Sequence, residues 1–383
     1  VTMNKFTYSY PTKVYFGEGS AKEALPVELA HIGNTVMLAY GGGSVKKNGI
    51  YDEIRGLLVQ AGKNIVEFSG IASNPTYAKV QEGAALVREQ QVDFILAAGG
   101  GSVIDCCKAV SAQAVLAEDL RELEYVKGKF PVQGIPLGAV VTVSGTGAEM
   151  NSGAVITLEE RKWKGGIFAA APSFAVLDPA YTKSVPPMQV LSGAFDTFSH
   201  AMETFLGHSD QDNVSDDLAL AVMRNTVVNM RRLLADMSDM QARSNLMWDS
   251  AMAENGILKC GRLTDFQAYQ IEHQLGAYTD CNHGQGLAVI QPVYCRHILK
   301  DAPEKFTRLA RMVFDEDSAE AGLSALEAFI KKCGLPTTMR ELKSAVEITP
   351  DLLRQVADTV NIIKCGPREL SKDEIYEILM ECV

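Results

Sequence analysis

Hydrophobic positions in the first ~185 residues fall into short runs that alternate with helical stretches. The buried-strand candidates are NTVMLAY (34–40), NIVEF (64–68), DFILAAGGGS (93–102) and IPLGAVVTVSGTGAEMN (135–151), three of which lead into glycine-containing loops. Helical patterns over about 48–61, 76–90 and 103–116 separate these runs. Strand, glycine turn and helix in repeated order predict a parallel, doubly wound α/β sheet.

The pattern changes after LDPAYTKSVPP (177–187), where apolar residues recur with the 3.6-residue period of helices. Pro187 suits the first turn of the first such helix. The predicted helical segments are 188–206, 215–236, 241–258, 266–278, 304–314, 318–333, 350–362 and 372–382. We therefore expect two domains, an α/β domain over residues 1–184 and an all-α domain over residues 185–383.

Length and composition agree with two domains and exclude some functions. A chain of 383 residues with 47% hydrophobic residues exceeds the usual size of one hydrophobic core. The net charge of −11 argues against binding nucleic acid or an anionic membrane. No apolar run approaches the ~20 residues of a membrane span, and the N-terminal residues lack a signal-peptide layout. The eight cysteines form no CxxC pair, so we expect reduced thiols and a cytoplasmic location.

The glycine loop GGGSVID (99–105) follows a predicted strand and opens a helix. Glycines at this place let backbone N–H groups approach a phosphate at the positive end of the helix. A tight turn with no ligand explains the same residues. The spacing matches neither GxGxxG nor the P-loop.

Two further loops extend the dinucleotide hypothesis. The loop AYGGGSVKK (39–47) has no acid before Asp52, and it carries Lys46 and Lys47. A carboxylate there would accept the ribose 2′-OH of NAD and repel the 2′-phosphate of NADP, so its absence favours NADP. The alternative is a solvated helix start. TVSGTGAEMN (142–151) offers hydroxyls for a nicotinamide or ribose, although such loops are also ordinary turns.

Acids and histidines with helical spacing suggest a metal site. Asp196 and His200 are i and i+4 in GAFDTFSHAMET (193–204), so they share one helix face. Such a pair either binds a divalent cation or bridges helices without one. His273 lies in a second predicted helix, and His283 lies in a predicted Cys-Asn-His-Gly turn. From the residues alone, Asp196, His200, His273 and His283 are the candidate ligands of a metal between the two domains. The other histidines, at positions 31, 208 and 297, lie on surface-like segments.

The motifs together resemble those of the iron-containing (group III) alcohol dehydrogenase family, and most of all its butanol-dehydrogenase branch. The resemblance rests on YPTKVYFGEGS (10–20), AAGGGSVIDCCKA (97–109), TVSGTGAEMNSGAVI (142–156), FAVLDPAYTKSVPP (174–187), GAFDTFSHAME (193–203) and EHQLGAYTDCNHGQGLAV (272–289). It implies a Rossmann-like N-terminal domain and a helical C-terminal domain, the architecture shared with dehydroquinate synthase. It also implies an Fe²⁺ or Zn²⁺ site and a homodimer.

The resemblance also assigns residues. The positions that match the family's cofactor contacts are Gly41, Gly42, Ser44, Gly100, Gly101, Ser102, Asp105, Thr142, Thr146, Asn151, Lys162 and Thr182. Asp196, His200 and His283 match three of its four metal ligands. His273 matches a histidine that lies near the nicotinamide, which makes it a candidate for proton relay.

The fourth metal ligand is where the chain departs from the family. The family reads WATHxxxH, whereas this chain reads FQAYQIEH, so Tyr269 stands at the ligand position. Three readings are open: a phenolate ligand, a site of three residues completed by water or by His273, or no metal at all. A tyrosine is a poorer neutral donor than histidine, so altered metal binding is expected.

The resulting hypothesis is an oxidoreductase that transfers hydride between NADPH, or NADH, and a small primary alcohol or aldehyde. Two alternatives remain at this point. One is a lyase or cyclase on the same scaffold, and the other is a nucleotide-binding protein that has lost its metal or its chemistry.

Overall fold

The computed structural model describes residues 3–207 and 213–383, and the chain divides into two compact units. One unit spans Tyr10–Val185. The other holds residues 186–383 together with the residues that precede Tyr10. Within the described ranges, no helix is long and apolar enough to cross a membrane.

A six-stranded parallel sheet forms the centre of the α/β unit, with the strand order β1-β8-β5-β4-β2-β3. Its strands are β1 (Lys13–Phe16), β2 (Thr35–Ala39), β3 (Asn64–Phe68), β4 (Phe94–Gly99), β5 (Leu137–Val141) and β8 (Phe174–Leu177). The predicted parallel, doubly wound sheet is confirmed. The sequence pattern did not reveal β1, β8 or the antiparallel hairpin of β6 (Gly153–Leu158) and β7 (Trp163–Phe168).

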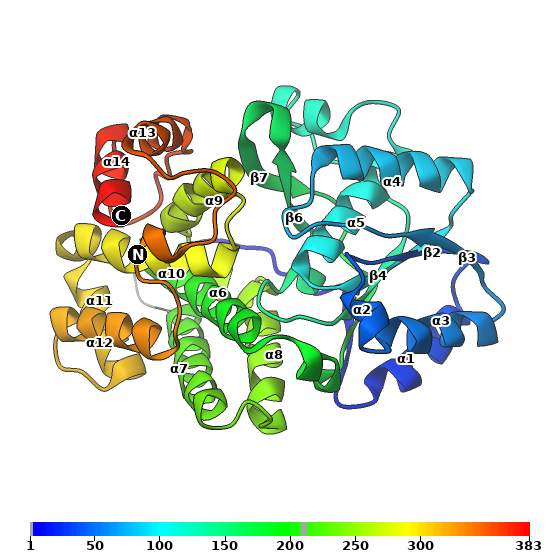
Figure 1. The fold of residues 1–383 in the computed structure, drawn as a ribbon, viewed down its shortest axis with the longest axis horizontal. Helices are drawn as coiled ribbons and strands as arrows, with labels where there is room; N and C mark the ends of the chain where they lie inside the picture. Colours follow the sequence, from blue (N-terminus) through cyan, green and yellow to red (C-terminus); the bar gives the residue numbers. More distant parts are fainter. Residues whose placement is uncertain (1–2, 208–212) are drawn as a thin grey trace. The chain divides into compact units, whose positions relative to one another are not determined.

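Helices cover both faces of this sheet (Figure 1). They are α1 (Ser20–Leu29), α2 (Ser44–Lys47), α3 (Ile50–Gln60), α4 (Tyr77–Glu89) and α5 (Gly101–Val115). Because successive side chains of a strand point to opposite faces, Val36 and Leu38 of β2 pack in one core with α1 and α3. Helix α5 packs against α4, β4 and β5.

The strand order reverses between β2 and β4. The chain passes from β2 outward to the edge strand β3, then returns to β4 on the other side of β2. In open parallel sheets, such a reversal separates the loops that follow the two neighbouring strands and leaves a crevice for ligands. The two loops at this reversal are 40–43 and the turn around Gly100, which are two of the glycine loops singled out in the sequence.

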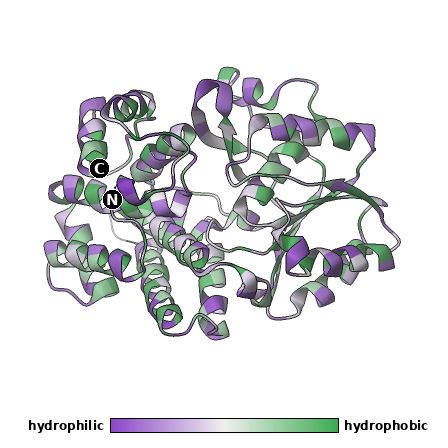
Figure 2. Ribbon diagram, in the orientation of Figure 1, coloured by the Kyte–Doolittle hydropathy of each residue, from purple (hydrophilic) through white to green (hydrophobic). Residues whose placement is uncertain are grey.

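The second unit is helical, as predicted. Its helices are α6 (Pro187–Leu206), α7 (Val214–Ala235), α8 (Met240–Glu254), α9 (Gln267–Thr279), α10 (His283–Ile298), α11 (Pro303–Leu309), α12 (Ala319–Lys332), α13 (Pro350–Thr359) and α14 (Lys372–Glu381). Phe195, Phe198 and Phe205 of α6 are fully buried in the core, and each such burial contributes about 1.5–3 kcal/mol. Figure 2 shows hydrophobic and hydrophilic residues on different faces of many helices.

The sequence pattern missed helix α10. Gly284, Gly286 and Pro292 lie within it, and these residue types ordinarily argue for a turn. His283 is therefore the first residue of a helix and not part of a turn. The side chain of Asn282 caps this helix by accepting a hydrogen bond from the backbone N–H of Gln285 at 3.1 Å.

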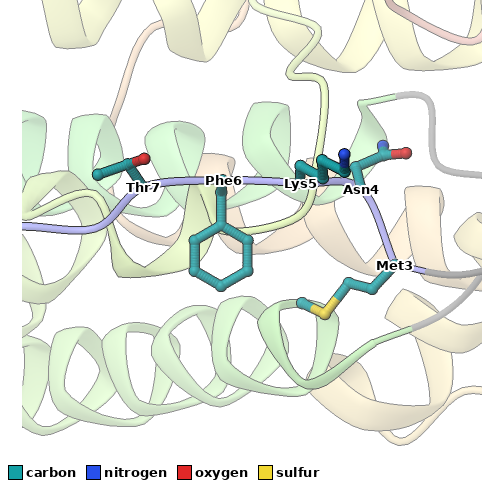
Figure 3. Close-up of a pocket in the computed structure, with 5 residues that line it drawn as sticks. All are labelled: Met3, Asn4, Lys5, Phe6 and Thr7. Atoms are coloured by element: carbon teal, nitrogen blue, oxygen red, sulfur yellow. The ribbon is translucent and has the colours of Figure 1, made fainter.

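The N-terminal segment lines a surface hollow of about 710 Å³, formed by Met3, Asn4, Lys5, Phe6 and Thr7. Figure 3 shows the side chains of Met3 and Phe6 on the same side of this extended segment. None of the residues predicted from the sequence to bind a cofactor or metal lines this hollow. It therefore plays no part in the site described below.

Candidate metal centre and dinucleotide loops

Helix α6 places Asp196 and His200 one turn apart, as the i,i+4 spacing predicted. Asp196 is 3% exposed and His200 is 9% exposed. The Nδ1 atom of His200 lies 3.7 Å from Oδ1 of Asp196. Its Nε2 atom lies 3.9 Å from Oε1 of Glu254, at the end of α8. His200 thus lies between two buried acids.

Helix α9 contributes Tyr269, Glu272 and His273, all buried. These residues share one face because they are three and four positions apart. The hydroxyl of Tyr269 donates to Oδ1 of Asp196 and also lies 3.0 Å from the carbonyl oxygen of Asp196. Its ring stacks on His200, with 4.8 Å between ring centroids. Tyr269 therefore contacts the predicted ligands as a hydrogen-bond donor.

Two glycines allow α10 to bring His283 close to both other helices. A Cβ atom on Gly284 would lie 2.2 Å from the carbonyl oxygen of Ser192 on α6. A Cβ atom on Gly286 would lie 2.9 Å from Cγ of Glu272 on α9. Real side chains do not fit at such distances, so glycine is needed at both positions for this packing.

The ring of His283 lies between two carboxylates. Its Nε2 atom is 3.5 Å from Oδ1 of Asp196, and its Nδ1 atom is hydrogen-bonded to Oε2 of Glu272. Burial lowers the pKa of His283, but the charges of Glu272 and Asp196 outweigh that effect and raise it to about 9. Burial and the Asp196 carboxylate raise the pKa of Tyr269 well above its usual value of 10. The phenol is therefore neutral in this arrangement.

The four residues at the predicted ligand positions lie together around Asp196. Ligand atoms of one ion lie about 3–4 Å from each other when each bond is about 2.1 Å. Oδ1 of Asp196 lies within this range of Nδ1 of His200 and of Nε2 of His283, but in the part of the chain that the structure describes the three residues do not form a group whose ligand atoms all lie within 4.8 Å of one another. The Tyr269 ring contacts both histidines, with centroids 4.8 Å from His200 and 5.1 Å from His283. With tyrosine in place of histidine at position 269, the residues at the family positions therefore do not form the family's four-ligand metal site.

Among the described residues, one group of metal-ligating side chains has its ligand atoms within 4.8 Å of one another. It consists of Glu272, His273 and His283. Sequence reasoning missed Glu272, although its position one residue before His273 and three after Tyr269 was a usable signal. It also missed Glu254, for which no local pattern exists because α8 brings it from elsewhere in the chain.

His31 is exposed, and His297 lies 3.2 Å from Glu374. His208 lies outside the described residues.

Several of the predicted dinucleotide positions lie around the start of α5. Gly100 precedes the helix and Gly101 begins it. A Cβ atom on Gly101 would lie 2.2 Å from Oγ1 of Thr146, so this glycine brings the 142–151 loop onto the helix start. The backbone N–H of Thr142 donates to the carbonyl oxygen of Gly99 at 3.0 Å. Thr142, Thr146, Gly100 and Gly101 are thus brought together.

Asp105 and Asn151 connect the same region to β6. Oδ2 of Asp105 accepts a hydrogen bond from the backbone N–H of Val155 at 2.9 Å. The buried Lys108 lies 3.6 Å from Asp105 and donates to Oδ1 of Asn151 at 3.1 Å. The side chains of Asp105 and Asn151 therefore make structural hydrogen bonds within the protein, and they are also candidate cofactor contacts.

The loop after β2 lies at the neighbouring strand end. Gly41 would place a Cβ atom 3.9 Å from Val103 of α5, so the two glycine loops are close. Gly42 has open space around it, and Ser44 begins α2. The hydroxyl of Ser102 donates to the carbonyl oxygen of Ser73.

The two remaining predicted contacts lie on other segments. Lys162 has a positive φ of 48° between the β6 and β7 strands. Thr182 follows β8, and its hydroxyl donates to the carbonyl oxygen of Pro179 at 2.8 Å.

Family models match both units of the chain. The model "Iron-containing alcohol dehydrogenase" matches residues 11–179, and "Fe-containing alcohol dehydrogenase family, C-terminal" matches residues 190–383. The chain belongs to the iron-containing alcohol dehydrogenase family. It is thus an oxidoreductase, and the resemblance inferred from the motifs is confirmed.

Relatives of this iron-containing alcohol dehydrogenase match it over nearly its whole length. It is 35% identical to the "Probable NADH-dependent butanol dehydrogenase 1" of Bacillus subtilis, covering 98% of this chain and 99% of that protein. It is 32% identical to the "NADPH-dependent aldehyde reductase YqhD" of Escherichia coli, covering 93% and 94%. The names of these relatives favour neither the lyase alternative nor the silent nucleotide-binding protein.

The fold of this iron-containing alcohol dehydrogenase matches solved structures of the same family. The NADH-dependent butanol dehydrogenase A of Thermotoga maritima superposes with a TM-score of 0.92 at 31% identity, covering 100% of this chain and 99% of that one. The predicted combination of a Rossmann-like domain and a helical domain is therefore confirmed.

Proposed function

We propose that this protein reduces small aldehydes, or oxidises the corresponding primary alcohols, by hydride transfer with a nicotinamide dinucleotide. One observation carries the proposal: both glycine loops lie at the reversal of strand order in a chain that belongs throughout to a dehydrogenase family. The names of its relatives, butanol dehydrogenases and an aldehyde reductase, agree with this substrate class.

We propose NADPH as the preferred cofactor. The ammonium group of Lys46 lies over the rings of Tyr40 and Tyr51, at 5.2 and 4.7 Å from their centroids, just after the β2 loop. Glu67, at the end of neighbouring β3, is the nearby acid that could bind a ribose 2′-OH. Both tyrosine hydroxyls donate to its carboxylate, at 2.7 Å from Tyr40. A positive charge combined with an engaged carboxylate favours a 2′-phosphate.

The relatives divide on this point, because their names include NADH-dependent and NADPH-dependent enzymes. The proposal therefore rests on the residues around Lys46. Titration of the purified protein with NADPH and NADH, followed by reduced-nicotinamide fluorescence, tests it directly. Tighter binding of NADH would refute the cofactor preference and leave the dehydrogenase proposal intact.

In this proposal the two units bind different reactants. The α/β unit, predicted as residues 1–184, binds the dinucleotide through the glycine-loop residues and the more distant Lys162 and Thr182. The helical unit, predicted as residues 185–383, holds the alcohol or aldehyde near Asp196, His200, Tyr269 and His283. A divalent metal, when bound, would polarise the substrate oxygen. His273 belongs to the reaction centre. It acts either as the proton relay that the sequence predicted or as a direct contact of the metal that would polarise the substrate oxygen.

We also propose a cytoplasmic homodimer, on the reduced cysteines and on the family resemblance. All eight cysteines are free thiols in the described part of the chain. Sedimentation of the purified protein tests the dimer.

The activity test uses purified protein supplied with Fe²⁺ under anaerobic conditions, or with Zn²⁺. Oxidation of NADPH is followed at 340 nm across a panel of short aldehydes. Turnover of at least one aldehyde supports the proposal. Bound NADPH with no turnover of any aldehyde or alcohol, in either direction and with either metal, would overturn it.

A further inference from the structure

Lys108 is a fully buried lysine in the middle of α5. Its Nζ atom donates to the carbonyl oxygen of Gly153 at 2.6 Å and to Oδ1 of Asn151 at 3.1 Å. It also lies 3.6 Å from Oδ1 of Asp105. Lysine is almost never fully buried unless its ammonium group is paired, because removing that charge from water is costly. Lys108 is therefore held in place by polar partners of the α/β unit.

The partners of Lys108 lie on two different elements. Asp105 lies one turn earlier on α5, whereas Asn151 and Gly153 lie where the 142–151 loop leads into β6. Helix α5 packs against β6 (Figure 1). Oδ1 of Asn151 also accepts from the backbone N–H of Gly153 at 3.1 Å, and Oδ2 of Asp105 accepts from the backbone N–H of Val155 at 2.9 Å. The ammonium group thus joins both side chains into one network between the helix and the strand.

Lys108 itself is placed to act on a ligand only through other residues. Its side chain has no exposed surface. It also lies about two turns after Gly101, which is roughly 10 Å along the helix from the end that would face a phosphate. Asp105 and Asn151, in contrast, match the family's cofactor contacts, and the 142–151 loop is predicted from the sequence to bind a nicotinamide or ribose. The side chains that Lys108 holds are therefore the ones proposed to touch the cofactor.

Stability alone does not explain why these charges are buried together. Glu149, in the same loop, is 3% exposed. Burial raises its pKa to about 7, while its own backbone N–H and the charge of Lys108 act in the opposite direction. Replacing a buried ion pair by well-packed apolar residues often leaves a protein equally stable or more stable. What an apolar residue could not supply is the orientation that the ammonium group imposes on Asp105 and Asn151.

We propose that Lys108 is a positioning residue for the cofactor, which holds Asp105 and Asn151 in the orientation that binds the nicotinamide half of the dinucleotide. Contact residues bind well only when the residues behind them fix their rotamers. The inference rests on the proposed dinucleotide binding of this chain. Loss of Lys108 should weaken the contacts to the nicotinamide half and spare those to the adenosine half, which is proposed to bind beside Lys46.

Two ligands separate the two halves of the cofactor. NADPH carries both halves, and adenosine 2′,5′-bisphosphate carries only the adenosine half with its 2′-phosphate. Both are titrated by calorimetry at pH 8 into the full-length protein and its Lys108→Met, Lys46→Ala and Lys164→Met variants. Lys164 on β7 is a second buried lysine of the same unit and matches none of the cofactor positions, so Lys164→Met controls for the loss of a buried lysine. Circular dichroism and thermal unfolding establish that each variant is folded.

Lys108→Met should weaken NADPH binding by about 10-fold or more, the usual effect of losing a charge-assisted contact. It should change the affinity for adenosine 2′,5′-bisphosphate by less than about twofold. Lys46→Ala should weaken the binding of both ligands, and Lys164→Met should weaken neither. If Lys108→Met does not fold, its combination with Glu149→Gln decides the question. At pH 8 Glu149 is above its pKa of about 7 and is ionised, so the double variant removes one charge of each sign.

Unchanged NADPH binding in the folded Lys108 variant would overturn the inference. An equal weakening for both ligands, or an equal loss of NADPH binding in Lys164→Met, would also overturn it, because either result indicates a general disturbance of the α/β unit. Binding of NADPH without measurable binding of the bisphosphate would contradict the division into halves on which the inference depends. Failure of the wild-type protein to bind NADPH would refute the proposed function and this inference with it. The other contrary results leave the proposed function intact and refute only the role of Lys108.

Discussion

The hydroxyl of Tyr269 donates a hydrogen bond to the buried carboxylate of Asp196, across two helices and 73 residues of chain. This bond joins the residue that departs from the family pattern to the first predicted metal ligand. It gives the tyrosine a role that does not require a metal, because it stabilises an acid that would otherwise be buried with less compensation.

Tyr269→Phe should therefore lower the free energy of unfolding. The substitution removes only the hydroxyl and leaves Asp196 with one hydrogen bond fewer, which costs about 1–3 kcal/mol. Urea unfolding monitored by circular dichroism measures the change. Tyr278→Phe, at a half-buried position of the same helix, is the control and should cost less than about 0.5 kcal/mol. Equal effects of the two substitutions would show that the Tyr269–Asp196 bond contributes little.

Tyr269→His should create a metal site on the Asp196 side of His283. A second imidazole would replace the phenol as a neighbour of His200, and imidazole is the better neutral ligand. We expect Co²⁺ affinity to rise by about 10-fold or more and to become sensitive to His200→Asn. Calorimetry on the single variant and on Tyr269→His combined with His200→Asn measures this dependence. An affinity that is unchanged by Tyr269→His would show that Tyr269 does not limit metal binding.

The sequence predicted the components of the site better than their arrangement. The i,i+4 spacing placed Asp196 and His200 together on α6, and Tyr269 and His273 together on α9, because helix geometry alone determines such pairs. The contact between Glu272 and His283 depends on the packing of α9 against α10, and Gly286 makes this packing possible. A local pattern contains no such information, and the glycines of α10 made that helix look like a turn.

In the α/β unit, too, local features could be predicted from the sequence, whereas the arrangement of the loops could not. Glycine loops after strands were visible in the sequence, and the order of strands and helices predicted a parallel sheet. The adjacency of the loops after β2 and β4 follows from the reversal of strand order, which periodicity does not reveal. Glu67 was missed because β3 pairs with β2 and brings it beside Tyr40.

Lys46→Ala should weaken NADPH binding more than NADH binding. The ammonium group after the β2 loop is proposed to face the 2′-phosphate, and loss of a charge-assisted contact costs about 1.5–3 kcal/mol, or roughly 10-fold or more in affinity. Fluorescence titration with both cofactors measures the ratio. Lys13→Ala on the opposite edge strand β1 removes the same charge and should leave the ratio unchanged. A parallel loss for both cofactors would place Lys46 away from the 2′-position.

Gly101→Ala and Gly42→Ala should separate folding from dinucleotide binding. A Cβ atom at position 101 would collide with Thr146, whereas position 42 has open space. Gly101→Ala should therefore cost about 1–3 kcal/mol of stability, and Gly42→Ala should cost little. Gly42→Ala should still weaken dinucleotide binding if the backbone there approaches a phosphate. Thermal unfolding and cofactor titration of both variants test this, and undiminished cofactor binding in Gly42→Ala would remove Gly42 from the proposed contacts.

Asp249 should make the stability of the helical unit depend on pH. Burial raises its pKa from 3.8 to about 7, although Asn225 and Thr226 donate hydrogen bonds to its carboxylate. Between pH 3.8 and pH 7 the folded state binds more protons at Asp249 than the unfolded state does. The contribution of Asp249 to the free energy of unfolding is therefore fully present at low pH and is lost as the pH rises toward 7. Over pH 5–8 this loss amounts to about 2–3 kcal/mol at about 1.4 kcal/mol per pKa unit.

The Asp249→Asn variant isolates this contribution. It cannot ionise, so its stability relative to the wild-type protein should rise by that amount between pH 5 and pH 8. Urea unfolding at closely spaced pH values measures the difference. The exposed Asp351→Asn on α13 should show no such trend. A constant difference between wild type and Asp249→Asn over this range would mean that Asp249 is already ionised in the folded protein at pH 5, so that Asn225 and Thr226 outweigh its burial.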